Sequence, residues 1–482
     1  MQTIWNKNTE TENKPRCKED QSCDVLIVGA GIAGLLCAFR LQQQGYRVIV
    51  VERQKMNENI TSKSTAKITI QMGLFYSELI DNLGIKNAKL ITDLYQEAIN
   101  EYERIIHANK IECSFKRLDS CLYSKSNYDL LRREYEAARI LGIECSFDKS
   151  AQTPDGQSAV LTFYNQAQFN PLQFTYALSK ELSVYENTKI LSIDEEEAVT
   201  EYGIIRFKQV VFATHYPEIN VPGFYFMKMH QERSHILVLD NVPIENRILY
   251  GIDNDGCSFR WEQNLLLFGG ENYRTGSNHT KEKMFSLRSK ARRLFPQAKE
   301  LMSWSTQDCI TLDHLPYIGP YSRIKKNWFV VTGFNKWGMI NAMAGALIIP
   351  GWIKGEKRRI HELFDSRRSV FASLTQWTKE GIEAIGGLLK EAFYIPECEA
   401  KDLPIGHGGV VWLSHKKWGI YRESETYFHL VNVRCPHMGC QLEWNPEEKS
   451  WDCPCHGSRF DWKGKVLDGP SQQNLDYHQI KL

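Results

Sequence analysis

The stretch CDVLIVGAGIAGLLCAFRLQQQGYRVIVVERQ, residues 23–54, decides the fold of the first part of the chain. Its short apolar runs predict a strand from Asp24 to Val28 and a second strand from Val48 to Val51. Between them, the residues from Ile32 to Gln44 have the pattern of a helix. A strand, a helix and a second strand in this order predict a βαβ unit, and hence a parallel sheet covered by helices.

A glycine-rich turn joins the first strand to this helix, with the pattern Gly29-x-Gly31-x-x-Gly34. Glycines at these positions let the backbone approach a pyrophosphate at the N-terminus of the helix. The second strand ends at Glu52, where a carboxylate can accept hydrogen bonds from ribose hydroxyls. The stretch therefore predicts a dinucleotide-binding site, although this fingerprint alone does not distinguish FAD from NAD.

A second informative stretch is CPHMGCQLEWNPEEKSWDCPCHGSRF, residues 435–460, which contains two loops with metal-binding side chains. One loop has Cys435 and His437, and the other has Cys453 and His456. Two thiolates and two imidazoles suit a [2Fe–2S] cluster in which cysteines hold one iron and histidines hold the other. Residues i and i+2 of an extended loop point the same way, roughly 6–7 Å apart, and can reach two neighbouring irons. A zinc site is the alternative, but its usual pattern pairs C-x₂₋₄-C with H-x₃₋₅-H.

This stretch, together with GKVLDGP at residues 464–470, resembles the Rieske family of iron–sulfur proteins. The resemblance implies four cluster ligands, which are Cys435, His437, Cys453 and His456. It also implies a disulfide between Cys440 and Cys455 that joins the two loops. Such a bond would be unusual in a cytosolic protein, where thiols are kept reduced.

Two further positions bear on the redox potential that this resemblance implies. Ser458 corresponds to a serine whose hydroxyl donates to a cluster sulfur, and Phe460 stands where high-potential members have a tyrosine that bonds a ligand sulfur. Hydrogen bonds to sulfur raise the potential of the cluster. We therefore predict a potential in the middle of the Rieske range of about −150 to +300 mV.

Small hydroxylated residues fill TSKSTAKITIQMG, residues 61–73. We predict that this loop wraps the phosphates of the dinucleotide, with Ser64, Thr65 and Lys67 as hydrogen-bond donors. A plain polar loop is the alternative.

A second strand–turn–helix pattern lies further along the chain. The predicted strand from Trp328 to Thr332 meets Gly333, and an apolar helix begins at Gly338. The positive N-terminal end of such a helix faces whatever lies across the turn, and an anionic reduced flavin would be stabilised there.

From about residue 22 to residue 365, the chain resembles the D-amino acid oxidase family of FAD-dependent oxidoreductases. The motifs that carry this resemblance are VGAGIAG (28–34) with Glu52-Arg53, YENTKI (185–190), VVFATH (210–215), DHLPYIG (313–319) and GFNKWGM (333–339). The resemblance implies FAD contacts at Gly29, Gly31, Gly34, Glu52, Arg53, Ile190, Ala213, Thr214, Gly333, Phe334, Trp337, Gly338 and Met339. It also implies a substrate chamber made by a sheet that covers the flavin, which fits residues 224–304.

One departure from this family concerns the substrate. Where glycine oxidase-like members have an arginine that grips the substrate carboxylate, WSTQD (304–308) has Asp308. An acid repels a carboxylate and attracts an ammonium, so we predict an amine-type or cationic substrate. The alternative is that Asp308 turns away into a salt bridge. Lys336 is the candidate for a cation near the N1–C2=O edge of the flavin, with an ordinary surface lysine as the alternative.

The composition sets further bounds. A chain of 482 residues has room for two or three domains, and its net charge of +1 provides no electrostatic reason to expect nucleic acid as a partner. The polar N-terminus lacks an apolar signal core, and the longest apolar run, Met339 to Ile353, is too short to span a bilayer. We therefore expect a cytoplasmic protein without a transmembrane segment.

We predict four consecutive parts: a polar segment at 1–22, an FAD-dependent oxidoreductase domain at 23–365, a helical linker at 366–394 and a Rieske domain at 395–482. The expected fold class is α/β plus all-β. A doubly wound FAD domain with an inserted antiparallel substrate sheet is followed by a C-terminal β-domain.

The two resemblances together imply an FAD-dependent dehydrogenase that oxidises a small amine-type or amino-acid-like substrate. We expect electrons to pass from FAD to the [2Fe–2S] cluster and then to an external acceptor, either a protein or a quinone-like molecule. Two alternatives stay open. One is an oxygen-using oxidase or monooxygenase, and the other is a redox sensor or electron-transfer module that turns over no substrate.

Overall fold

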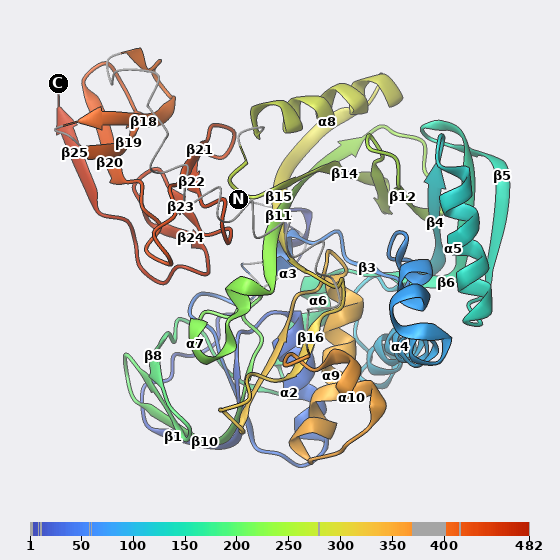
Figure 1. Ribbon diagram of the computed structural model, residues 1–482, viewed down its shortest axis with the longest axis horizontal. Helices are drawn as coiled ribbons and strands as arrows, with labels where there is room; N and C mark the ends of the chain where they lie inside the picture. Colours follow the sequence, from blue (N-terminus) through green and yellow to red (C-terminus); the bar gives the residue numbers. More distant parts are fainter. Residues whose placement is uncertain are drawn as a thin grey trace.

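The computed structural model of the chain describes residues 3–7, 9, 12–56, 58, 60–277, 280–368, 402–413 and 416–481. Figure 1 shows a large part with two sheets and their helices, and a smaller β-domain drawn in orange and red at the C-terminal end. The predicted helical linker at 366–394 lies outside the described residues, except for its first three residues.

The first sheet of the large part has eight strands, and its central pairings are parallel. β1 (Gln21–Val28) lies between β2 (Val48–Val51) and β10 (Ile204–Phe212). The other strands are β7 (Ser183–Tyr185), β8 (Ile190–Ile193), β9 (Glu197–Thr200), β16 (Tyr317–Pro320) and β17 (Trp328–Thr332). Runs of Val and Ile suit the central strands, because both faces of a parallel sheet are covered.

The predicted βαβ unit is confirmed. β2 and β17 have the predicted bounds, and the helix α2 (Ile32–Gln43) follows the glycine turn. β1 begins three residues earlier than predicted, because its parallel pairing with β10 extends to Gln21. A second helix, α9 (Gly338–Ile353), begins at the predicted glycine and packs against α2.

The second sheet has nine strands and is built from two separate parts of the chain. The residues from 224 to 304 were expected to form it as an insertion, and the structure adds earlier strands and extends the last one to Thr311. The two parts meet where β12 pairs in parallel with β4, for example Ile248 with Ser120. The strands are β3 (Lys67–Ile68), β4 (Lys116–Ser124), β5 (Cys145–Thr153), β6 (Gly156–Gln168), β11 (Met229–Asp240), β12 (Arg247–Gly251), β13 (Ser258–Glu262), β14 (Leu265–Arg274) and β15 (Lys299–Thr311).

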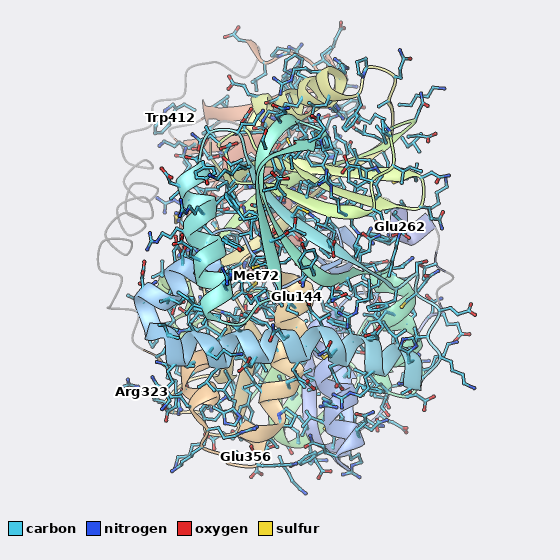
Figure 2. The ribbon with its side chains drawn as sticks, turned by 90° about the vertical axis from the view of Figure 1, so that its right-hand side faces the viewer. Met72, Glu144, Glu262, Arg323, Glu356 and Trp412 are labelled. Atoms are coloured by element: carbon cyan, nitrogen blue, oxygen red, sulfur yellow. A yellow bond between two sulfur atoms is a disulfide. The ribbon has the colours of Figure 1, made fainter. Side chains whose placement is uncertain are left out.

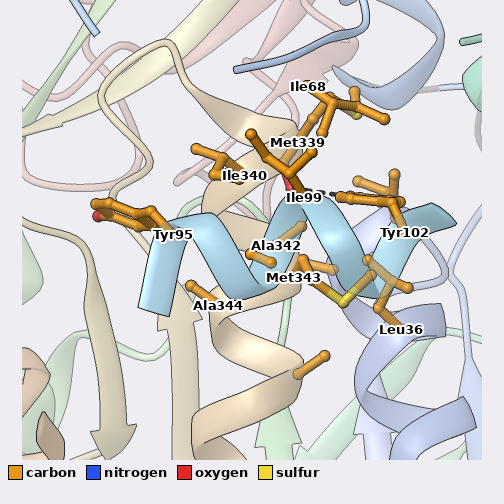
Figure 3. Packing of buried hydrophobic residues seen from close by; sticks show 14 of the residues in the cluster. Leu36, Ile68, Tyr95, Ile99, Tyr102, Met339, Ile340, Ala342, Met343 and Ala344 are labelled. Carbon is orange, nitrogen blue, oxygen red and sulfur yellow. Dashed lines mark hydrogen bonds between the residues drawn. The ribbon is translucent and has the colours of Figure 1, made fainter. Parts of the chain in front are cut away.

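A long helix, α4 (Phe75–Ala108), crosses the molecule between the second sheet and the helices of the first sheet (Figure 2). Gly84, with φ of 76°, interrupts this helix and divides it into two parts. The Tyr102 hydroxyl donates to the carbonyl of Met339 at 2.8 Å, as the dashed line in Figure 3 shows. Tyr95 donates to the Asn341 side chain at 2.9 Å. These bonds and the apolar packing around them hold the start of α9 in place.

Shorter helices complete the large part. They are α1 (Ile4–Lys7), α3 (Ile60–Lys63), α5 (Tyr128–Ile140), α6 (Pro171–Ser179), α7 (Asn220–Gly223), the 3₁₀ turn η1 (Tyr225–Met227), α8 (Thr280–Leu294) and α10 (Arg359–Phe364). Among the helices of the described residues, none is long and apolar enough to cross a membrane.

The C-terminal domain consists of two four-stranded antiparallel sheets. The first contains β18 (Gly408–Leu413), β19 (Lys416–Arg422), β20 (Tyr427–Asn432) and β25 (Tyr477–Lys481). The second contains β21 (Glu443–Asn445), β22 (Ser450–Asp452), β23 (Arg459–Asp461) and β24 (Val466–Asp468). The predicted β-domain is therefore confirmed in class. The first loop with metal-binding side chains precedes β21, and the second joins β22 to β23.

Candidate functional site

A cavity of about 640 Å³ lies between the two sheets of the large part. This volume falls in the usual range of cofactor and ligand sites, about 300–1,000 Å³. Its walls come from the glycine turn after β1, from the start of α9 and from the second sheet. Asp468 and Gly469 of the C-terminal domain also line it, so both domains shape the same cavity.

The glycine turn has the close backbone contacts that a dinucleotide site needs. Gly29 has φ of 107°, and a Cβ there would lie 2.6 Å from the carbonyl oxygen of Ala213. A Cβ on Gly34 would lie 1.9 Å from the carbonyl oxygen of Gly29. Gly29 and Gly31 therefore face the cavity, whereas Gly34 lets α2 pack against β1 and does not line the cavity.

Glu52 is buried at the end of β2, where burial raises its pKa. Its carboxylate accepts hydrogen bonds from the backbone N–H groups of Ala30 at 3.1 Å and Gln54 at 3.0 Å. These bonds hold the carboxylate at the edge of the cavity, where ribose hydroxyls could also donate to it. The backbone of the glycine turn is open to a pyrophosphate, and the carboxylate beside it is held in place for ribose hydroxyls. This arrangement fits FAD.

Apart from Gly34, every residue that the sequence proposed for this cofactor lines the cavity. These residues are Gly29, Gly31, Glu52, Arg53, Ser64, Thr65, Lys67, Ile190, Ala213, Thr214, Gly333, Phe334, Trp337, Gly338 and Met339. α9 has no side-chain cap at its N-terminus, so backbone N–H groups of its first turn stay available on the cavity side.

Lys67 lies on the part of the wall that the second sheet provides. Its ammonium donates to the Ser258 hydroxyl of β13 and lies 6.0 Å from the ring centre of Tyr250 on β12. Burial, with the nearby Arg260 cation, lowers the pKa of Lys67 to about 7. Lys67 therefore reaches from the loop at 61–73 to the second sheet, and its role as a phosphate donor stays a prediction.

Asp308 lies on β15, directly opposite Glu232 of β11, and it lines the cavity. Burial raises the pKa of Asp308 to about 6, although the Lys336 cation opposes this rise. Lys336 also lines the cavity, with φ of 71°, and its ammonium pairs with Glu232 at 2.7 Å. Lys336 therefore forms its ion pair with Glu232.

The two loops of the C-terminal domain bring the predicted cluster residues together. Cys435 and Cys453 are buried and hydrogen-bond to each other, which lowers the pKa of Cys435 to about 7. The rings of His437 and His456 lie 4.9 Å apart. Within the described residues, both Nδ1 atoms are buried without a hydrogen-bond partner. Two adjacent thiols and two unsatisfied imidazole nitrogens fit a [2Fe–2S] cluster.

The predicted disulfide between Cys440 and Cys455 is present and joins the two loops. Ser458 is fully buried, accepts a hydrogen bond from the backbone N–H of Ser471 at 3.0 Å and lies within hydrogen-bonding reach of the Cys435 thiol. Its hydroxyl therefore lies beside a ligand sulfur.

Phe460 is buried in the apolar core that surrounds the cluster cysteines. Phe460→Tyr is expected to raise the cluster potential, because a phenol at this position can donate to a ligand sulfur. Protein-film voltammetry measures the shift. Phe428→Tyr, a buried phenylalanine of the other sheet, is the control and should leave the potential unchanged. A Phe460→Tyr protein without a rise would show that this position does not tune the cluster.

The two domains meet at the end of β11 and β15, which lie beside the second sheet of the C-terminal domain (Figure 1). The Gln231 side-chain amide donates to the carbonyls of His456 at 2.6 Å and Gly469 at 3.0 Å. Gln307 donates to the carbonyl of Gly457 at 2.9 Å. A Cβ on Gly457 would lie 2.6 Å from the Gln231 side chain, so the loop that carries His456 is pressed against β11.

The imidazole edge of the cluster site also contacts the large domain. His437 Nε2 lies 2.7 Å from the Asn220 side-chain oxygen, and Phe226 lies 6.4 Å from the His437 ring and 5.8 Å from the His456 ring. Sequence reasoning missed Gln231, Asn220 and Phe226, because no motif marks them and only the docking of the domains brings them to the cluster.

Comparison with known proteins agrees with both sites. Residues 24–349 match the family described as FAD dependent oxidoreductase, and residues 393–479 match the Rieske [2Fe-2S] domain. YhfW of Bacillus subtilis, whose name describes it as a Rieske 2Fe-2S iron-sulfur protein, is 31% identical over 98% of this chain and 97% of its own length. The cytochrome b6-f complex iron-sulfur subunit 1 of a Nostoc species is 47% identical over 51 residues, which cover 11% of this chain and 28% of that subunit.

Among solved structures, glycine oxidase from Geobacillus kaustophilus is similar, with a TM-score of 0.58 and 19% identity over 72% of this chain and 99% of that one. L-proline dehydrogenase from P. horikoshii has a TM-score of 0.59 and 16% identity over 72% of this chain and 98% of that one. These two likenesses concern the fold. The chain therefore belongs to the family of FAD dependent oxidoreductases (DAO) and carries a C-terminal Rieske domain, so it is an oxidoreductase with FAD and a [2Fe–2S] cluster as cofactors.

Proposed function

We propose that this protein is a dehydrogenase that oxidises a small amine-type or amino-acid-like substrate and passes the electrons from FAD to the Rieske cluster, and then to an external acceptor. The single observation that carries the proposal is the position of Gln231. Its side chain lines the FAD cavity and donates to the carbonyl of the cluster ligand His456 at 2.6 Å. One buried side chain therefore touches both cofactor sites.

The two cofactors supply different chemistry. When bound, FAD accepts a hydride from a C–N bond, and the cluster carries single electrons. The chain's own residues would hold FAD in the cavity and the cluster between the two Cys-His loops. Gln231 and Gln307 are both buried, and Gln307 donates to Gln231 at 2.7 Å, so buried hydrogen bonds join the two domains at this point.

The part of the cavity wall that the second sheet forms favours a cationic substrate. Asp308 faces the cavity, while the Lys336 ammonium is already paired with Glu232. An ionised Asp308 could therefore accept hydrogen bonds from a substrate ammonium. Lys67, whose pKa is about 7, lies on the same sheet, and its protonated form could bind a substrate carboxylate below that pH.

Binding of an amine should strengthen as the pH rises through about 6, because the Asp308 carboxyl loses its proton there. Asp308→Asn should remove the part of this pH dependence that lies near pH 6 and weaken binding at pH 8 by about tenfold or more, as expected for the loss of a charged hydrogen bond. Thermal-shift protection by a series of amines measures this. Glu300→Gln, an exposed acid of the same strand, is the control. If every amine that protects the wild type protects Asp308→Asn equally well, Asp308 does not bind the amine.

The test of the function is an anaerobic substrate screen of the holoprotein. Bleaching of the flavin followed by the EPR signal of a reduced Rieske cluster is the expected result. Bleaching with peroxide release in air, and no cluster signal, would instead support an oxidase. A library that bleaches nothing would favour a redox sensor.

Gln231→Leu should slow reduction of the cluster after flavin bleaching by about tenfold, because a buried contact between the two sites is lost. The rate of flavin bleaching by substrate should change less than the rate of cluster reduction. Stopped-flow absorption and freeze-quench EPR measure the two steps separately. Gln43→Leu, at the exposed end of α2, is the control. Equal slowing of both steps would show that Gln231 acts on substrate binding alone.

A further inference from the structure

A short segment of the large domain leads from the FAD cavity to the cluster histidines. Glu218 lines the cavity. Two residues further on, Asn220 begins α7, and its side-chain oxygen lies 2.7 Å from His437 Nε2. At the end of the segment, the Phe226 ring packs edge-on against the rings of His437 and His456. Since α7 lies on the side of the large domain that faces the C-terminal domain (Figure 1), this segment covers the imidazole edge of the cluster site.

The two histidines differ in what their two ring nitrogens contact. Within the described residues, the Nδ1 atom of each ring is buried without a partner, which suits coordination to iron. A neutral imidazole that coordinates through Nδ1 has its proton on Nε2, so Nε2 is a hydrogen-bond donor. For His437 the acceptor is the Asn220 side-chain oxygen. The His456 ring is hydrogen-bonded to the backbone of Phe226, where a ring N–H can bond only the carbonyl. The large domain therefore supplies the outer acceptor for both histidines.

Asn220 stands on a rigid support. Its backbone carbonyl accepts a hydrogen bond from the Phe224 N–H at 2.7 Å, which closes the turn of α7. Tyr321 is fully buried and holds both ends of this turn. Its hydroxyl donates to the Ile219 carbonyl, and its own carbonyl accepts from the Tyr225 hydroxyl at 2.8 Å. None of these bonds uses the side chain of Asn220, so a substitution there should leave the turn in place.

The second cluster loop has its own attachment to the large domain. Its four successive backbone carbonyls, those of residues 454–457, accept hydrogen bonds from side chains on β11, β14 and β15, which are Gln231, Arg274 and Gln307. Loss of the Asn220 side chain would leave these bonds, and with them the contact between the domains, in place. The effect of Asn220 on the cluster can therefore be tested separately from the contact between the domains.

We propose that Asn220 is a positioning residue for the cluster: its side-chain oxygen accepts the Nε2–H of His437, fixes the ring for coordination through Nδ1 and lowers the potential of the cluster. An acceptor at the outer nitrogen makes the imidazole a stronger electron donor. A stronger donor stabilises the oxidised cluster, which is one charge unit more positive than the reduced cluster, and so lowers the potential. The inference goes beyond the proposed function, because it depends on the cluster alone and needs no substrate.

The test measures the midpoint potential of the cluster in the full-length holoprotein at pH 7, by a chemical redox titration followed through the EPR signal of the reduced cluster. Asn220→Leu removes the acceptor and should raise the potential. Asn220→Asp provides a carboxylate, a stronger acceptor of the same shape, and should lower the potential. Each shift should correspond to about a tenfold change in the ratio of oxidised to reduced cluster, or about 59 mV for one electron.

Val221 provides the matched controls, because it follows Asn220 and is 65% exposed. Val221→Asp places the same charge one residue away, in water, and Val221→Leu changes only an exposed apolar side chain. Both should shift the potential by much less than the Asn220 variants, since solvent and salt screen an exposed charge. As a second readout, the electron–nuclear couplings of the histidine nitrogens, measured by pulsed EPR, should change in both Asn220 variants and stay unchanged in both Val221 variants.

Two results would overturn the proposal. A shift in the same direction in Asn220→Leu and Asn220→Asp would indicate a loosened loop instead of a changed hydrogen bond. A shift in Asn220→Asp no larger than that in Val221→Asp would indicate a general effect of charge. If Asn220→Leu does not retain the cluster, the comparison of Asn220→Asp with Val221→Asp decides alone. A failed substrate screen leaves these measurements intact, because the cluster is titrated chemically.

Discussion

Arg459→Met is expected to destabilise the C-terminal domain by about 3–5 kcal/mol or more and to prevent stable retention of the cluster. Arg459 is buried and donates to three carboxylates, at 3.0 Å to Asp452, 2.9 Å to Asp468 and 2.5 Å to Glu448. Removing the cation would leave these acids buried with too few partners. Urea unfolding followed by the visible absorption of the cluster measures the loss.

The same change has consequences for the contact between the domains. Glu448 also pairs with Arg233 of β11, whose side chain is almost fully buried. Asp468, which lines the FAD cavity, lies 4.0 Å from the Lys63 ammonium. The buried charges at the junction therefore form one network, and Arg459 provides its central cation. The variant should also show weaker protection of the junction in hydrogen exchange.

The loss of stability in Arg459→Met should depend on pH in a defined direction. Burial alone would raise the pKa of Asp468, but Lys63 and Arg459 lower it below its ordinary value. A carboxyl with a lowered pKa in the folded state contributes stability above the ordinary pKa of about 3.9 and loses it as the pH falls. The difference between wild type and Arg459→Met should thus be largest above about pH 5 and shrink towards pH 3.

Arg206→Met provides the matched control. Arg206 also has two acidic neighbours, Glu197 at 2.8 Å and Asp20 at 3.8 Å, but its side chain is 54% exposed. Exposed ion pairs contribute about 0–1 kcal/mol, so this variant should unfold like the wild type. Similar losses of stability in both variants would mean that burial of the charge network does not increase its contribution to stability.

Gly34→Ala is expected to abolish FAD binding and to destabilise the large domain. The added Cβ would lie 1.9 Å from the carbonyl oxygen of Gly29, which is backbone and cannot rotate away. α2 would have to move from β1, and the cost should exceed the roughly 1–3 kcal/mol of ordinary overpacking. Flavin fluorescence after heat release measures the bound FAD, and circular dichroism follows thermal unfolding.

Gly269→Ala is the control for this change. Gly269 lies on β14 and lines the same cavity. A methyl group added there would have the His235 carbonyl oxygen as its nearest neighbour, at an ordinary contact distance of 3.5 Å. Its FAD content and unfolding temperature should therefore stay near those of the wild type. A Gly34→Ala protein with full FAD content would contradict the packing argument.

The sequence was sufficient for the features that depend on local pattern. The βαβ unit, the glycine turn, the helix that starts at Gly338 and the two cluster loops are short segments whose residue types and spacing restrict the backbone directly. The family resemblances then placed the cofactor residues along one cavity, because motifs that hold one ligand must converge. The second sheet was predicted only in part, since pairing of β12 with β4 is long-range and leaves no local signal.

By itself, the sequence determined the two cofactor sites and the class of each domain. Glycine turns and Cys-His loops can be recognised because their functional groups lie close together in the sequence. The tertiary structure alone decided how the domains meet. Gln231, Asn220 and Phe226 reach the cluster residues from more than 200 positions away in the chain. Their roles depend on packing between distant segments, which no local sequence pattern records.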